Sequence, residues 1–335
     1  MKYSKKIWGA LLGTVAGLFI AWLLLSHSTG EAGIAKALAN IFNRVMAADT
    51  GLLLGAFGLF FASQVLRAVR WMILSFQDSY PFSLSMAVTS IHVGLGHLLP
   101  LRMADVAFVG LFRYFGAVPV GHGTAKVFFA KLLDITAMGV VIGSAAAAGA
   151  GEMALAAPLL VLVGLAGIAF MFPVLKFLSR PLRWILARIS PGGKVHWFED
   201  LLRASSTRNR KGRLMLAFVV SIGVWISKLS MFCLMLAALG ITGVPVWKVF
   251  LASGVTNIIM ALPIHGLLSI GTVEAGWAAG FAMVGVEGAA IASINIIELG
   301  FSVHILWMTM AVLLMIMAIP VLAFHRSKGV SRNGG

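Results

Sequence analysis

The residues best suited to chemistry gather in one short, mostly apolar stretch, 97–105, which reads HLLPLRMAD. Arg102 offers a guanidinium fork that fits phosphate oxygens, and His97 and Asp105 add an imidazole and a carboxylate. Pro100 removes an amide donor and breaks the helix, which leaves backbone groups that hydrocarbon cannot satisfy. Within a membrane, such a stretch must face protein or a water-filled cavity.

A second stretch of this kind, 262–274, reads LPIHGLLSIGTVE and carries His265 and Glu274. A charged side chain at the middle of a bilayer costs roughly 2.5–3.5 kcal/mol on insertion scales, so charges placed there indicate function more than stability. Two interrupted apolar hairpins, one in each half of the chain, are typical of transporters built from repeats. Both stretches are therefore candidate parts of a cargo site.

Three further charged residues complete the candidate site. Lys131 and Asp134 stand three residues apart in an apolar span, so they share a helix face and can neutralise one another. Arg70 lies beside Trp71 at the end of another span. Two interpretations of Arg70 remain open, an interfacial anchor or a binding site for a headgroup phosphate.

Catalysis by His97, Arg102 and Asp105 is a competing interpretation. However, the 11 acidic residues are scattered, and the sequence contains neither Asp-x-Asp nor His-Glu-x-x-His. Cys233 is the only cysteine, which excludes a disulfide framework and a thiolate metal site. We therefore expect no enzyme activity, no metal and no cofactor.

The composition places these residues in a membrane protein. Hydrophobic residues make up 60% of the chain and charged residues only 11%, which is typical of a polytopic membrane protein. The net charge of +15 could suggest nucleic acid as a partner. The basic residues, however, fall mainly in short loops between apolar spans, so anionic lipid headgroups are the expected partner and nucleic acid is not.

Hydropathy predicts the elements that must position the candidate site. Broken hairpins are expected at about 83–118 and 247–284, and an amphipathic surface segment at 29–49. Apolar spans are expected at about 7–25, 51–75, 123–148, 153–175, 214–239 and 288–324. The last is too long for one span, and we interpret it as a shorter helix with Asn295 and Glu298, followed by a full span with His304.

The predicted fold is an all-α polytopic bundle in which two re-entrant broken hairpins form an inverted repeat. One integral membrane domain is expected over 1–325, with halves at about 51–175 and 214–324 and a basic cytoplasmic loop at 176–213. Residues 326–335 are expected to form a disordered tail. If both termini and the loop are cytoplasmic, the hairpins enter from opposite sides and meet near the midplane.

Four motifs resemble those of the lysylphosphatidylglycerol synthase transmembrane family, whose members are also called flippase-like proteins. The stretch 97–105 resembles the family's N-x-L-P-x-R-x-G-E, and KLLD at 131–134 resembles E-R-x-x-D. SIGTVEAG at 269–276 resembles G-x-G-x-x-E, and RAVRW at 67–71 resembles R-x-x-R-W. The resemblance covers about 50–320 and implies a helical bundle with re-entrant hairpins that moves lipids between leaflets.

Departures from the motifs fall within the expected cargo site. Asp105 follows Ala104 where the family has Gly-Glu, Lys131 replaces an arginine, and His265 falls where small residues or proline are common. The resemblance therefore implies the fold more firmly than the cargo. No polar aminoacyl-transfer domain follows the spans, so we expect a stand-alone member that does not aminoacylate lipid.

The expected function is movement of a phospholipid or lipid-linked headgroup between leaflets of the bacterial cytoplasmic membrane. Arg102 would hold the phosphate, and Asp105 and Glu274 would recognise a cationic headgroup. The expected partners are anionic or aminoacylated phospholipids, with a second copy of the chain as a further candidate. The alternatives are a lipid-binding or regulatory subunit that transports nothing and, less favoured, a lipid-modifying enzyme.

The distribution of Lys and Arg yields a test of topology. Both termini and the 176–213 loop should be cytoplasmic, while Ala150 and Gly243 should face outside. With Cys233 replaced, a cysteine introduced at Gly243 should react in intact cells with an impermeant reagent. A cysteine introduced at Ser205 should stay unlabelled, and its labelling would contradict the topology.

Overall fold

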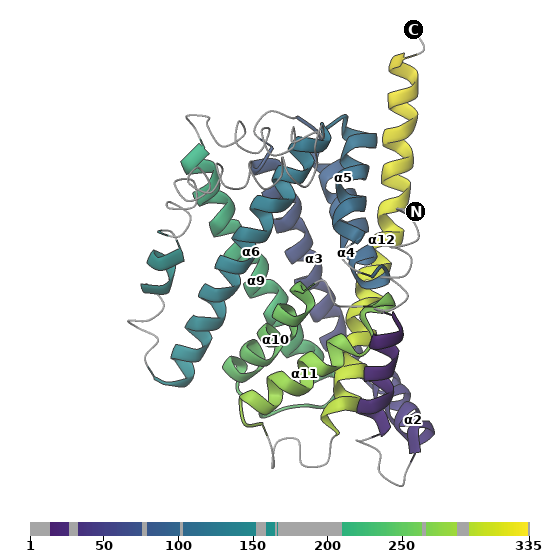
Figure 1. Cartoon of the computed structure of the whole chain (residues 1–335), viewed down its shortest axis with the longest axis vertical. Helices are drawn as coiled ribbons and strands as arrows, with labels where there is room; N and C mark the ends of the chain where they lie inside the picture. The colour runs from purple at the N-terminus through teal and green to yellow at the C-terminus, as the bar shows by residue number, and fades with distance from the viewer. Residues whose placement is uncertain are drawn as a thin grey trace, which may run out of the picture.

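The computed structural model describes most of the membrane domain, and Figure 1 shows it. The described residues are 14–26, 33–75, 79–100, 103–151, 159–164, 166, 210–262, 266–286 and 295–333. Arg102 and His265 lie outside them, as do nearly all of the predicted span 153–175 and the loop 176–213 up to residue 209.

The described residues form helices joined by short connections, without a β-strand, which confirms the all-α prediction. An N-terminal helix spans Thr14–Ser26, and η2, a short 3₁₀ turn, spans Leu267–Ser269. A short helical piece is described at 159–164. The longer helices are α2 (Gly33–Met46), α3 (Thr50–Ile73), α4 (Phe82–Leu98), α5 (Met103–Gly116), α6 (Val120–Gly149), α9 (Arg210–Ala238), α10 (Val246–Ala261), α11 (Thr272–Met283) and α12 (Ile296–Asn333).

Four of these helices, α3, α6, α9 and α12, are long and apolar enough to cross a membrane. The first three match the predicted spans 51–75, 123–148 and 214–239, and α2 matches the predicted amphipathic segment 29–49. The helical membrane bundle is thus established. The four helices α4, α5, α10 and α11 are shorter, and they lie in the regions where broken hairpins were expected.

The prediction of two helices in the last apolar region was wrong. A single helix, α12, begins at Ile296 and continues to Asn333, into the segment 326–335 for which disorder was predicted. The Asn295 carboxamide oxygen accepts the N–H of Ile297 at 3.0 Å and so caps this helix. Glu298 lies in the first turn of this helix, and its carboxylate accepts a hydrogen bond from the Asn40 amide of α2, at 3.3 Å.

Helix directions follow from contacts at the ends of the bundle. The N–H of Asp49, just before α3, donates to the carbonyl of Ala238 at the end of α9, at 2.9 Å. These two helices are therefore antiparallel neighbours. Gly149, at the end of α6, lies against the ring of Trp247 at the start of α10. In Figure 1, α4 and α5 lie toward the end where α12 finishes, whereas α10 and α11 lie at the opposite end.

Close backbone approaches hold the second hairpin. The N-terminal helix passes so near the turn before α11 that a Cβ on Gly271 would lie 2.2 Å from the Gly17 carbonyl oxygen. Between α10 and α11, Gly276 and Gly280 form a small-xxx-small face. A Cβ on Gly280 would lie 2.5 Å from the carbonyl oxygen of Ala252. Glycine is thus required where these backbones meet.

Replacing Gly280 with alanine should separate α10 from α11, because the added methyl group meets backbone atoms that cannot rotate away. We expect a loss of about 1–3 kcal/mol in stability, measured as a lower melting temperature in detergent. Gly58→Ala is the matched control, since a Cβ at this exposed position in α3 meets nothing within 4 Å. Equal melting temperatures for the two variants would contradict the tight packing.

Candidate functional site

A cavity of about 410 Å³ lies inside the bundle, with walls from α3, α4, α5, α6, α9, α10 and α12. Its lining combines aromatic and aliphatic side chains with titratable and amide groups. The polar members of the lining are Arg67, His92, His97, Asp105, Lys131, Asp134, Lys228 and Asn257. Charges of both signs therefore face one space within an otherwise apolar domain.

Asp105 joins the first hairpin to α6. Its Oδ1 atom lies 2.9 Å from His92 Nε2 on α4 and 3.1 Å from Lys131 Nζ on α6. Lys131 and Asp134 were expected to neutralise one another through their shared helix face. The structure instead gives Lys131 an ion pair with Asp105, because α5 brings a carboxylate close to α6.

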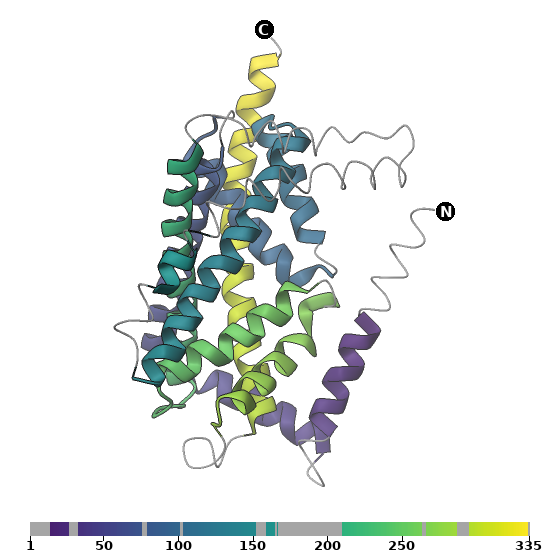
Figure 2. The ribbon, with the colours of Figure 1, turned by 60° about the vertical axis from the view of Figure 1, so that its left-hand side comes forward.

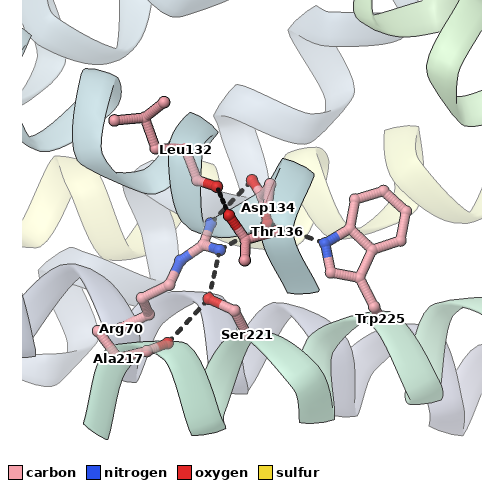
Figure 3. Close-up of polar contacts among 7 residues, drawn as sticks. All are labelled: Arg70, Leu132, Asp134, Thr136, Ala217, Ser221 and Trp225. Carbon is pink, nitrogen blue, oxygen red and sulfur yellow. Dashed lines mark hydrogen bonds and ion pairs between the residues drawn. The ribbon is translucent and has the colours of Figure 1, made fainter. Parts of the chain in front are cut away.

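Asp134 is held by a different set of groups, shown in Figure 3. Arg70 on α3 meets it with both guanidinium nitrogens, at 2.6 Å and 3.2 Å. The indole N–H of Trp225 on α9 donates to Asp134 Oδ1 at 3.1 Å. Arg70 also donates to Ser221 Oγ on α9 at 3.0 Å. Arg70 is fully buried, so it joins three spanning helices and is not an interfacial anchor.

Two cations that the sequence-based site omitted also line the cavity. Arg67 lies about one turn before Arg70, and its buried Nε atom has no hydrogen-bond partner among the described residues. Lys228 on α9 donates to Asn257 Oδ1 on α10 at 2.5 Å. Its ammonium also lies over the rings of Trp307 and Trp225, at 4.7 Å and 5.1 Å from their centroids. The available signal was a cation inside an apolar span.

Glu274 lies outside the cavity lining, in a second polar cluster. Its Oε2 atom accepts the N–H of Gly271 at 2.7 Å, and its Oε1 atom lies 2.6 Å from Nδ1 of His304 on α12. Both side chains are buried. The ring of His97, which does line the cavity, lies 6.1 Å from the ring of His304 and 4.3 Å from that of Trp307.

The structure thus gathers part of the predicted site. His97, Asp105, Lys131 and Asp134 line one cavity, and Arg70 lies directly behind Asp134. Glu274 does not line the cavity; it contacts His304, whose ring lies near that of the cavity-lining His97. Within the described residues, no group of three or more His, Cys, Asp or Glu side chains is placed to hold a metal ion.

The Arg70–Asp134 pair yields a test of stability. Asp134→Asn leaves the Arg70 guanidinium buried without a carboxylate, so the variant should lose about 3–5 kcal/mol of stability. A lower melting temperature of the purified protein in detergent would show this loss. The double variant Arg70→Met/Asp134→Asn removes the stranded charge and should recover much of it. A double variant that melts below Asp134→Asn would contradict the pairing argument.

Comparison with known families adds to this geometry. The family model of the lysylphosphatidylglycerol synthase TM region matches residues 7–312, which include both hairpins and the whole described cavity lining. Neither a curated protein nor a solved structure matches the chain. Because the family match spans well over half of the 335 residues, this chain belongs to the lysylphosphatidylglycerol synthase transmembrane family, a group of membrane proteins related to lipid handling.

Proposed function

We propose that this protein moves a phospholipid or a lipid-linked headgroup between the leaflets of the membrane, in the manner of a flippase. The observation that supports this most is the mixed-charge cavity between the spanning helices. Charged side chains in a lipid-facing domain are costly, and they are typical of substrate pathways. The acyl chains would stay in the bilayer while the headgroup occupies the cavity.

The order and direction of the helices support a two-fold arrangement of the transport machinery. A spanning helix, a helical hairpin and a second spanning helix occur twice, as α3–α4–α5–α6 and as α9–α10–α11–α12. The two hairpins lie toward opposite ends in Figure 1. We infer an inverted repeat with two re-entrant hairpins, which allows one half to rock against the other around a central site.

Charge pairing favours an anionic group of the lipid as the part that binds. The lining holds three cations, Arg67, Lys131 and Lys228, against two carboxylates, Asp105 and Asp134. Each carboxylate already has partners in the protein. A phosphate would thus complete the cavity better than an ammonium group, although an aminoacylated lipid carries both. We assign phosphate binding to Arg67 and Lys228, and Arg102 remains a further candidate.

The membrane we propose is the bacterial cytoplasmic membrane, with both termini inside. The start of α9 and the end of α12 lie at the same end of the bundle in Figure 1, which agrees with a cytoplasmic loop before α9 and a cytoplasmic C-terminus. We also propose that the protein is not an enzyme. A regulatory subunit that binds lipid without moving it is the other outcome that a transport assay can reveal.

The function is tested by transfer of labelled phospholipids in proteoliposomes, followed by chemical quenching of the label in the outer leaflet. Wild-type protein should accelerate transfer over empty vesicles. Lipid binding without acceleration would favour the regulatory subunit, and lipid modification without transfer would favour an enzyme. Either result would overturn transport.

Arg67→Gln is the sharpest variant for this assay. The change removes a charge-assisted hydrogen bond to phosphate that contributes roughly 1.5–3 kcal/mol, so transfer should fall about tenfold or more. Lys36→Gln, at an exposed position of α2, removes the same charge outside the cavity and should leave transfer unchanged. Wild-type rates in a monodisperse Arg67→Gln variant would exclude Arg67 from phosphate binding.

A further inference from the structure

We propose that Glu274 and His304 form a proton-binding site, and that proton binding there drives the second hairpin during transport. This inference rests on the proposed function for its coupling to lipid, but not for the proton site itself. The proton site is separate from the headgroup cavity, because neither Glu274 nor His304 lines that cavity.

The geometry of the pair defines where the proton goes. The imidazole Nδ1 lies 2.6 Å from the carboxylate, so Nδ1–H donates to Glu274 Oε1. The other ring nitrogen, Nε2, is buried and has no hydrogen-bond partner among the described residues. A neutral imidazole beside a carboxylate gives the pair one net negative charge. One proton added at Nε2 makes an imidazolium and brings the net charge to zero, and loss of that proton reverses the step.

Burial makes this change of charge matter. Glu274 has no exposed surface and His304 is only 3% exposed, so neither charge state is screened by bulk water. Helix α12 packs directly against α11 at this point, since a Cβ on Gly300 would lie at van der Waals distance, 3.4 Å, from Glu274 Cα. The imidazole therefore comes from a spanning helix and the carboxylate from the hairpin.

A route for the proton starts at the cavity. His97 on α4 lines the cavity, and its ring lies 6.1 Å from that of His304. Because His97 lies between the cavity and the Glu274–His304 pair, its imidazole can relay a proton from cavity water to the buried pair. Transport of a headgroup through the cavity and proton movement to Glu274 would then share one aqueous entrance.

Other charged groups on the surrounding helices have contacts of their own in the described part of the chain. Lys228 on α9 donates to Asn257, and Lys248 on α10 donates to the carbonyl of Gly285. Glu298 on α12 accepts from Asn40. Across the cavity, His92 and Lys131 contact Asp105. None of these contacts joins the Glu274–His304 pair, whose charge is therefore set locally.

The hairpin responds because the same carboxylate holds its turn. Glu274 Oε2 caps the N–H of Gly271, which has φ 82°, and the turn also places Leu268 and Ser269 at φ 58° and 54°. Two non-glycine residues with a left-handed backbone persist only where neighbouring contacts hold them. A change in the charge of the pair therefore reaches a strained turn through one hydrogen bond.

The proton site is tested first without transport. In detergent-solubilised full-length protein with ¹⁵N-labelled histidine, the His304 signal is assigned by its loss in His304→Gln. We expect its Nε2 resonance to move between the neutral and the protonated position when the pH is changed, and Glu274→Gln to alter that response. A His304 imidazole that keeps one protonation form at every pH at which the protein stays folded would overturn the proposal, whether or not the protein moves lipid.

The coupling is tested in proteoliposomes with and without a pH gradient. The gradient should change wild-type lipid transfer by at least about fivefold. Glu274→Gln keeps an oxygen to cap Gly271 but cannot hold the charge, so the ratio of its transfer rates with and without the gradient should fall to about one, whatever its rate at equal pH. Glu298→Gln, a buried carboxylate on α12 paired with Asn40, should keep the response. An unaltered response in Glu274→Gln, or none in the wild type, would overturn the coupling.

Discussion

The bilayer's intolerance of unpaired charge is the constraint on which this structure depends. A chain that is 60% hydrophobic buries Arg70, Lys126, Lys228 and Glu274 within its described bundle. Each such group must find a partner inside, because lipid offers none. The result is a set of polar contacts that run between helices, and these contacts decide which helices lie together.

Two of these sets of contacts link different groups of helices in the bundle. The Arg70–Asp134 pair, with Ser221 and Trp225, links α3, α6 and α9 through a fork of charge-assisted hydrogen bonds. The Asp105 set links α4, α5 and α6. Both border one cavity, so the contacts that stabilise the bundle also fix the walls of the candidate site. Figure 2 shows the second hairpin, in light green, in the lower part of the bundle, with the purple N-terminal helix beside it.

The sequence allowed the spanning helices and the family to be predicted, because hydropathy and short motifs depend on residues close together in the chain. It could not pair Asp105 with Lys131 or His304 with Glu274, since such contacts depend on how helices pack across 26 or 30 positions of sequence. Lys131 and Asp134 share a helix face as expected, but their closest partners come from other helices, Asp105 of α5 for Lys131 and Arg70 of α3 and Trp225 of α9 for Asp134. The predicted site included Arg70 and not Arg67. The two lie about one helical turn apart, and the sequence does not show that Arg67 is the one that lines the cavity. The continuous α12 was missed because its apolar region is longer than one span, and hydropathy does not show that a single helix can extend past the bilayer.

The contact between the N-terminal helix and the second hairpin has a mechanical meaning. Gly17 and Gly271 meet backbone to backbone, and Thr14 Oγ1 accepts the N–H of Leu267 at 3.1 Å, so helix and turn are latched at two points. A turn latched in this way cannot swing without carrying the first helix along. Movement of the N-terminal helix and movement of the second hairpin are therefore linked. A bulky fusion partner attached before the N-terminal helix would therefore load the second hairpin through these two contacts.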